Sequence, residues 1–255
     1  MVTGLDLFRE RFAAYADSYV LIGGAACYIH EEMSAQVPRA TKDLDVVLVV
    51  EALSADFVRE FWQFVREAGY TRRQRGADKH ECYRFLQPQD KRYPKQIELF
   101  ARAIGVLNIP EDAHLEPIPA GDELSSLSAI LMNEVYYHYT IVHSRLEEGA
   151  HIANIEALIC LKAKAFVDLC ARKAQGEHVD QDDMEKHKKD VFRLAPMLTG
   201  DARYELPLEM QNDMKLFFAA IKNELPNDDF LRNAGLRSQS VEVLLKVLKR
   251  TYLEE

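Results

Sequence analysis

The residues best placed for chemistry are two aspartates, Asp43 and Asp45, at the start of the valine-rich segment 43–50. Residues two apart in a β-strand point to the same face, so the two carboxylates should project together. Oxygen ligands of this kind suit Mg²⁺, which often binds one or two carboxylates together with substrate phosphates. Strand ends also carry solvated acids, so the neighbouring residues must decide between these two interpretations.

A pair of glycines, Gly23 and Gly24, follows the apolar segment 19–22 and precedes an expected helix over residues 25–33. Glycines at a helix N-terminus let a phosphate approach backbone N–H groups and the positive end of the helix dipole. A tight turn that simply requires glycine is the alternative.

Three polar residues stand directly before the aspartates: Arg39, Thr41 and Lys42. If the strand extends back that far, Arg39 and Thr41 share the side-chain parity of the two aspartates. We therefore expect this segment to orient the acids or to contact phosphate.

A third acid fits the same set. In the alternating segment 96–101, Ile97 and Leu99 fall on one face and Glu98 on the other. On a neighbouring strand, Glu98 would complete three carboxylates around a pair of metal ions. An exposed glutamate on an edge strand is the alternative.

The second half of the chain adds Lys162 and Asp190. Lys162 falls inside the apolar stripe of an expected helix over residues 155–173, and an ammonium there is costly unless it reaches an acid, a phosphate or water. A lysine with only a structural role could extend to solvent, in which case its replacement by methionine would be nearly neutral. Asp190 lies in the basic run 186–194, which is otherwise typical of a charged helix surface.

The N-terminal motifs IGGAA (22–26), RATKDLDVV (39–47) and IELF (97–100) resemble those of the nucleotidyltransferase superfamily related to polymerase beta. The resemblance implies a mixed sheet flanked by helices, with Mg²⁺ (or Mn²⁺) as the cofactor and an NTP as the substrate. It implies the metal ligands Asp43, Asp45 and Glu98.

The C-terminal motifs LKAKAF (161–166) and KHKKDVFRL (186–194) are similar to those of AbiEii-like nucleotidyltransferases, a group that includes abortive-infection and toxin–antitoxin toxins. The resemblance implies that Lys162 and Asp190 join the catalytic residues. The phosphate-binding residues that it implies are Gly23, Gly24, Arg39, Thr41, Lys42 and Lys189.

The expected activity is transfer of an NMP from an NTP to an acceptor, with release of pyrophosphate. A toxin of this kind would modify tRNA or a protein and would be held in check by an antitoxin partner. An antibiotic adenylyltransferase with a small-molecule acceptor and a non-catalytic nucleotide-binding regulator are the alternatives. Residues 71–95 carry a net charge of 8 − 3 = +5, which favours a nucleic-acid or protein acceptor unless the segment is a solvated hairpin.

Composition frames these expectations. The 255 residues carry a net charge of −9 and are 48% hydrophobic, which excludes a disordered chain and a generic cationic DNA-coating protein. The four cysteines are far apart, the N-terminus lacks the apolar run of a signal peptide, and no apolar stretch is long enough to span a membrane. We expect a cytoplasmic protein with no membrane partner.

The pattern of elements predicts an α+β fold with two domains, an αβ domain over residues 1–145 and a helical domain over residues 146–255 that contributes to the active site. The expected helices are 5–16, 25–33, 57–68, 155–173, 182–198, 206–223 and 238–253. The expected strands are 19–22, 43–50, 81–86, 96–101, 127–132 and 136–142, with loop or edge structure over residues 104–122.

Overall fold

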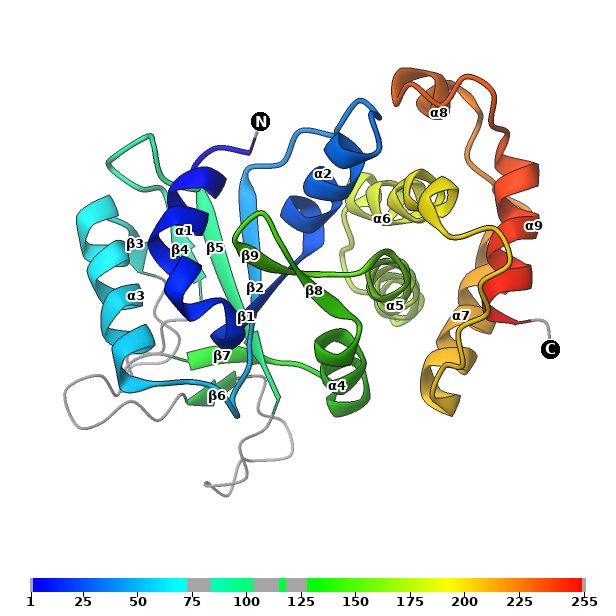
Figure 1. Ribbon diagram of the computed structural model, residues 1–255. Coiled ribbons are helices and arrows are strands. Elements are labelled where there is room, and N and C mark those ends of the chain that lie inside the picture. The colour runs from blue at the N-terminus through cyan, green and yellow to red at the C-terminus, as the bar shows by residue number, and fades with distance from the viewer. Residues whose placement is uncertain (1, 73–83, 103–114, 118–127, 254–255) are drawn as a thin grey trace. The chain divides into compact units, whose positions relative to one another are not determined.

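The computed structural model describes residues 2–72, 84–102, 115–117 and 128–253 (Figure 1). The chain forms two compact units, unit 1 with residues 1–28 and 40–153, and unit 2 with residues 29–39 and 154–255. It passes from unit 1 to unit 2 within helix α2 (Gly23–Met33). The domain division at residue 145 stays a prediction.

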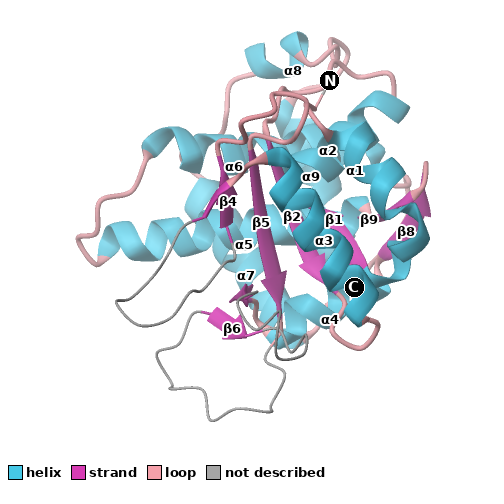
Figure 2. Ribbon diagram, turned by 90° about the vertical axis from the view of Figure 1, so that its left-hand side faces the viewer, coloured by secondary structure: helices cyan, strands magenta, loops and turns pink. Residues whose placement is uncertain are grey.

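Unit 1 is built on a mixed β-sheet, so the predicted α+β class is confirmed. Among the described residues the sheet has nine strands in the order β3-β4-β5-β2-β1-β9-β8, with β7 pairing both β5 and β6 (Figure 2). The strands are β1 (Tyr19–Ile22), β2 (Asp43–Leu48), β3 (Thr71–Arg72), β4 (Arg84–Leu86), β5 (Gln96–Ala101), β6 (Leu115–Pro117), β7 (Ser128–Leu131), β8 (Ser144–Glu147) and β9 (Ala150–Ala153). Strand β2 is parallel to β5 and antiparallel to β1.

Helices α1 (Leu5–Phe12) and α3 (Ala55–Ala68) cover one face of this sheet and lie side by side in Figure 1. Phe8 of α1 meets Phe64 of α3 with ring centroids 5.9 Å apart. From the sheet, Phe85 of β4 packs edge-on against Phe61 of α3 at 5.4 Å. The predicted helix over 57–68 is confirmed. Its apolar residues recur at helical spacing, so they form one face that packs on the sheet.

One prediction for unit 1 is wrong. Residues 136–142, expected as a strand, lie in helix α4 (Glu134–Val142). The side-chain oxygen of Asn133 accepts hydrogen bonds from the backbone N–H groups of Val135 and Tyr136 and so caps the helix. A short run of aromatic and β-branched residues cannot distinguish a strand from a buried helix by periodicity, and the cap was the missed signal.

The hairpin β8–β9 and the short strand β3 were not predicted. Glu148 and Gly149 turn the β8–β9 hairpin with φ of 47° and 82°, a left-handed pair that fits a two-residue hairpin turn. Of the expected strand 81–86, residues 81–83 lie outside the described residues, as do residues 73–83 of the basic stretch and most of the expected loop 104–122.

Unit 2 is helical, as predicted. Its helices are the C-terminal part of α2, then α5 (Ile155–Ala174), α6 (Gln181–Leu194), a 3₁₀ turn (Ala195–Met197), α7 (Leu208–Ile221), α8 (Asp229–Asn233) and α9 (Val241–Tyr252). Helix α5 packs against α6 and α7, where Phe166 and Phe217 meet with centroids 5.5 Å apart. Helix α8 was not predicted. Within the described part of the chain, no helix has both the length and the apolarity to cross a membrane.

Candidate functional site

The three candidate metal-binding carboxylates lie on one face of the sheet in unit 1. Along β2, Asp43 and Asp45 are half-buried whereas Leu44 is fully buried, so the aspartates share the face opposite to α1 and α3. Strand β5 runs parallel to β2 and sets Glu98 directly opposite Asp45. The structure therefore brings these three predicted residues to neighbouring positions of the sheet.

Glu98 has a partner that the sequence did not reveal. Arg84 on β4 stands opposite Glu98 in the antiparallel register, and its guanidinium forms an ion pair with the Glu98 carboxylate. In the described residues no set of three or more His, Cys, Asp or Glu side chains is arranged to hold a metal ion. The donor set fits a cation held by Asp43, Asp45 and substrate oxygens, and Glu98 would have to exchange Arg84 for the ion to join them.

The glycine pair is required by the close approach of two candidate residues. Gly23 begins α2 with φ of 62°, and a Cβ atom added there would lie 1.8 Å from Oδ2 of Asp45. A Cβ atom at Gly24 would lie 2.5 Å from Oγ1 of Thr41. The carboxylate of Asp45 thus lies against the N-terminus of α2, where the helix dipole favours negative charge. Lys42 is exposed beside these residues.

In unit 2, Asp190 joins two predicted cations. Its side chain is 3% exposed, and its Oδ2 lies 2.9 Å from Nζ of Lys162, which is itself 7% exposed. Nε and Nη2 of Arg39 donate to the two carboxylate oxygens of Asp190 at 3.0 and 3.2 Å. Lys162 therefore meets the acid that its position on an apolar helix face requires, and it does not extend to solvent.

Lys189 and Lys164 lie apart from this cluster. Nζ of Lys189 is 3.8 Å from Glu185, and its side chain is 41% exposed. Lys164 pairs with Asp168 one turn along α5 at 2.7 Å. The structure thus distinguishes Lys162 from the lysine two residues further on.

A second buried ion pair, missed from the sequence, holds the segment that carries Arg39. Nε of Arg193 donates to Oε1 of Glu31 at 2.7 Å, and its Nη2 donates to the carbonyl oxygen of Val37 at 2.7 Å. The backbone N–H of Arg39 donates to Oε2 of Glu31 at 2.8 Å. Glu31 and Arg193 are charged residues among buried neighbours, which indicates that each needs a partner. The sequence does not show that they pair with each other, because they lie far apart in the chain.

The electrostatics of unit 2 follow from burial and from these pairs. Burial raises the pKa of Asp190, but the charges of Lys162 and Arg39 outweigh it and hold the pKa below its usual range. Burial, followed by repulsion from Lys162, lowers the pKa of His187 to about 4. Asp190, Lys162 and Arg39 together carry a surplus of one positive charge, which suits an anionic ligand.

Comparison of the chain with protein-family models, with curated proteins and with solved structures gives no match in any of the three. The functional argument therefore starts from the residues described above.

Proposed function

We propose that the chain is a nucleotidyltransferase that moves an NMP from an NTP to an acceptor. The observation that carries the proposal is the shared face of Asp43 and Asp45, with Asp45 against the glycine turn at Gly23 and Glu98 opposite it on the next strand. In the reaction an acceptor oxygen bonds to the α-phosphorus, the bond between that phosphorus and the bridging oxygen breaks, and pyrophosphate leaves with the bond electrons.

Asp43 and Asp45 would hold Mg²⁺, for which Mn²⁺ is a substitute, together with triphosphate oxygens. The fit depends on two carboxylates that project from one strand face and are half-buried. When bound, the ion would neutralise charge on the phosphates during transfer.

Other residues of unit 1 would bind the phosphates and accept the proton of the acceptor hydroxyl. The backbone N–H groups at Gly23 and Gly24 would donate to phosphate oxygens at the start of α2. Glu98 would accept the proton of the attacking hydroxyl on a carboxylate oxygen once it separates from Arg84, or it would bind a second ion.

Within unit 2, two cations keep their proposed role as donors to an anion. Lys162 and Arg39 are both fixed by Asp190, which accepts a hydrogen bond from each cation and so limits their rotamers. Donors that are already oriented stabilise developing charge without reorganisation during the reaction. Asp190 is therefore a positioning residue in this proposal.

The acceptor is the open part of the proposal, and tRNA, a protein and a small molecule each present a suitable hydroxyl. Modification of tRNA or of a cellular protein would make the chain a toxin, whose activity an antitoxin partner would hold in check. The experiment that tests the proposal incubates the purified chain with each NTP labelled on the α-phosphate, Mg²⁺ and total bacterial RNA. Label in RNA or in protein, with release of pyrophosphate, supports nucleotidyl transfer, whereas no label and no pyrophosphate with any NTP contradicts transfer to RNA or to the chain itself.

A further inference from the structure

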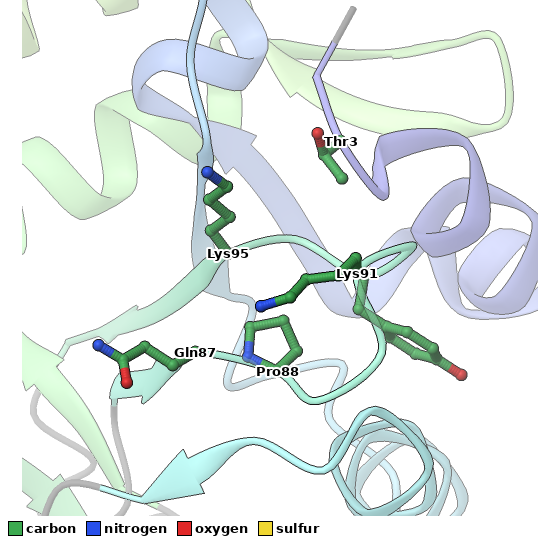
Figure 3. Close-up of a pocket in the computed structure, with 6 residues that line it drawn as sticks. Thr3, Gln87, Pro88, Lys91 and Lys95 are labelled. Carbon is green, nitrogen blue, oxygen red and sulfur yellow. The ribbon is translucent and has the colours of Figure 1, made fainter.

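A pocket of about 400 Å³ lies in unit 1, at the loop between β4 and β5 (Figure 3). Its lining residues come from the N-terminal segment and from the loop that joins β4 to β5: Thr3, Gln87, Pro88, Lys91, Tyr93 and Lys95. A pocket of this volume lies within the range that small ligands occupy.

The backbone around the pocket is held by one hydrogen bond within the loop and by hydrogen bonds to two other segments. The N–H of Gln87 donates to the carbonyl oxygen of Lys95 at 3.0 Å, which closes the loop at its base. The N–H of Gln89 donates to Ala68 of α3 at 2.9 Å, and the N–H of Lys95 donates to Lys42 at 3.1 Å. The loop is therefore a fixed support for the side chains that it carries.

The N-terminal segment approaches this loop so closely that only glycine fits. Gly4 has a φ of 78°, and a Cβ atom added there would lie 2.3 Å from Cδ of Pro94. This contact places Thr3 at the wall of the pocket, opposite the loop.

Positive charge is in excess among the described residues around the pocket. The carboxylate of Asp90, in the same loop, is bound by Arg92 through contacts of 3.0 and 2.7 Å, and none of the described residues that line the pocket is acidic. Lys91 and Lys95 are exposed, and no ion pair is found for either within the described residues. Figure 3 shows Lys91 extending from the loop towards Pro88. Two lysines among the six residues that line the pocket favour an anion.

We propose that this pocket binds a phosphate group. Lys91 and Lys95 would pair with the phosphate oxygens, and the side chains of Gln87 and Thr3 offer further donors. The ring of Tyr93 is fixed by packing on Phe64 at 4.7 Å, and its hydroxyl lies 3.3 Å from Glu67. The phosphate comes either from a small phosphate ester or from the backbone of an oligonucleotide, and the proposal stands independently of nucleotidyl transfer.

The test compares two doubly substituted variants with the wild-type chain. Lys91→Gln with Lys95→Gln removes two charges at the pocket, and Lys215→Gln with Lys246→Gln removes two exposed charges from helices α7 and α9. Binding is measured at low ionic strength with inorganic phosphate and with a short oligothymidylate that lacks terminal phosphates. Amine acylation followed by mass spectrometry reports which lysines each probe protects.

We expect at least one probe to protect Lys91 and Lys95, and to bind the pocket variant about tenfold more weakly while the control variant stays near wild type. Protection by inorganic phosphate alone identifies a small phosphate ester, and protection by the oligothymidylate identifies a nucleic-acid backbone. Protection by neither probe overturns the proposal. Equal losses in the two variants also overturn it, because they would reflect net charge alone.

Discussion

Replacing Lys162 with methionine should destabilise unit 2 strongly, because it removes one of the two cations around a buried carboxylate. The Asp190 side chain is 3% exposed, so its charge depends on Lys162 at 2.9 Å and on Arg39 at 3.0 Å. Removing one partner of a buried ion pair typically costs about 3–5 kcal/mol. Since Arg39 remains, we expect a loss of about 2–3 kcal/mol in the free energy of unfolding.

Lys164→Met is the matched control for this prediction. Its side chain is 30% exposed and pairs with Asp168 one turn away at 2.7 Å, with Asp213 further off at 3.8 Å, so the expected loss is only about 0.3–1 kcal/mol. Adding Asp190→Asn to Lys162→Met should recover part of the loss, because it removes the charge left with one cation. Urea denaturation at pH 7 and at pH 4 measures the free energy of unfolding of wild type, of the two single variants and of the double variant.

The pH dependence provides a second check on the same pair. Asp190 has a lowered pKa in the folded chain, so its contribution to stability is present above its unfolded value of about 4 and is lost as the pH falls through the folded value. Without Lys162 that pKa rises and the carboxylate protonates at higher pH. The gap between wild type and Lys162→Met should therefore narrow from pH 7 towards pH 4. Equal, small losses for Lys162→Met and Lys164→Met would refute this reasoning.

Two further predictions concern Gly23 and His187. Gly23→Ala should cost about 2 kcal/mol or more in the free energy of unfolding, because it puts a non-glycine residue in a left-handed conformation and a Cβ atom against Asp45. Gly149→Ala, where nothing lies within 4 Å of the added Cβ atom, should cost only about 1 kcal/mol. Equal losses of the two variants in thermal unfolding would contradict this prediction. The pKa of His187 is lowered to about 4, so between about pH 6.5 and 4 the unfolded chain binds a proton at this residue more readily than the folded chain does. Between pH 7 and pH 5 this residue should lower the free energy of unfolding of wild type by about 2 kcal/mol. The free energy of unfolding of His187→Gln should fall by about 2 kcal/mol less over the same range. Parallel curves of unfolding free energy against pH for the two chains would count against this prediction.

Local patterns predicted the central strands of the sheet and the shared face of the aspartates. Strands 19–22 and 96–101 match β1 and β5, because their alternation or apolar run is bounded by clear turn residues. The same patterns placed Asp43, Asp45 and Glu98 on equivalent faces, and the register between β2 and β5 then brought them together.

What the sequence could not predict depends on contacts between distant residues. Arg84 reaches Glu98 only through the pairing of β4 with β5. Glu31 and Arg193 lie far apart in the chain, yet their ion pair holds the segment 29–39 in the helical unit. Helix α4 was misassigned because one capping side chain, Asn133, outweighed a composition typical of strands.

Asp45→Asn tests the central claim most directly, through label transfer from each NTP with Mg²⁺ and total bacterial RNA. The substitution keeps the shape of a side chain that lies against Gly23 but removes its charge, so the melting temperature should stay close to wild type. The account predicts that wild type transfers label and that Asp45→Asn is slower by about 10²-fold or more, while Asp17→Asn, at a fully exposed carboxylate, transfers as wild type does. Full transfer by folded Asp45→Asn would contradict the account.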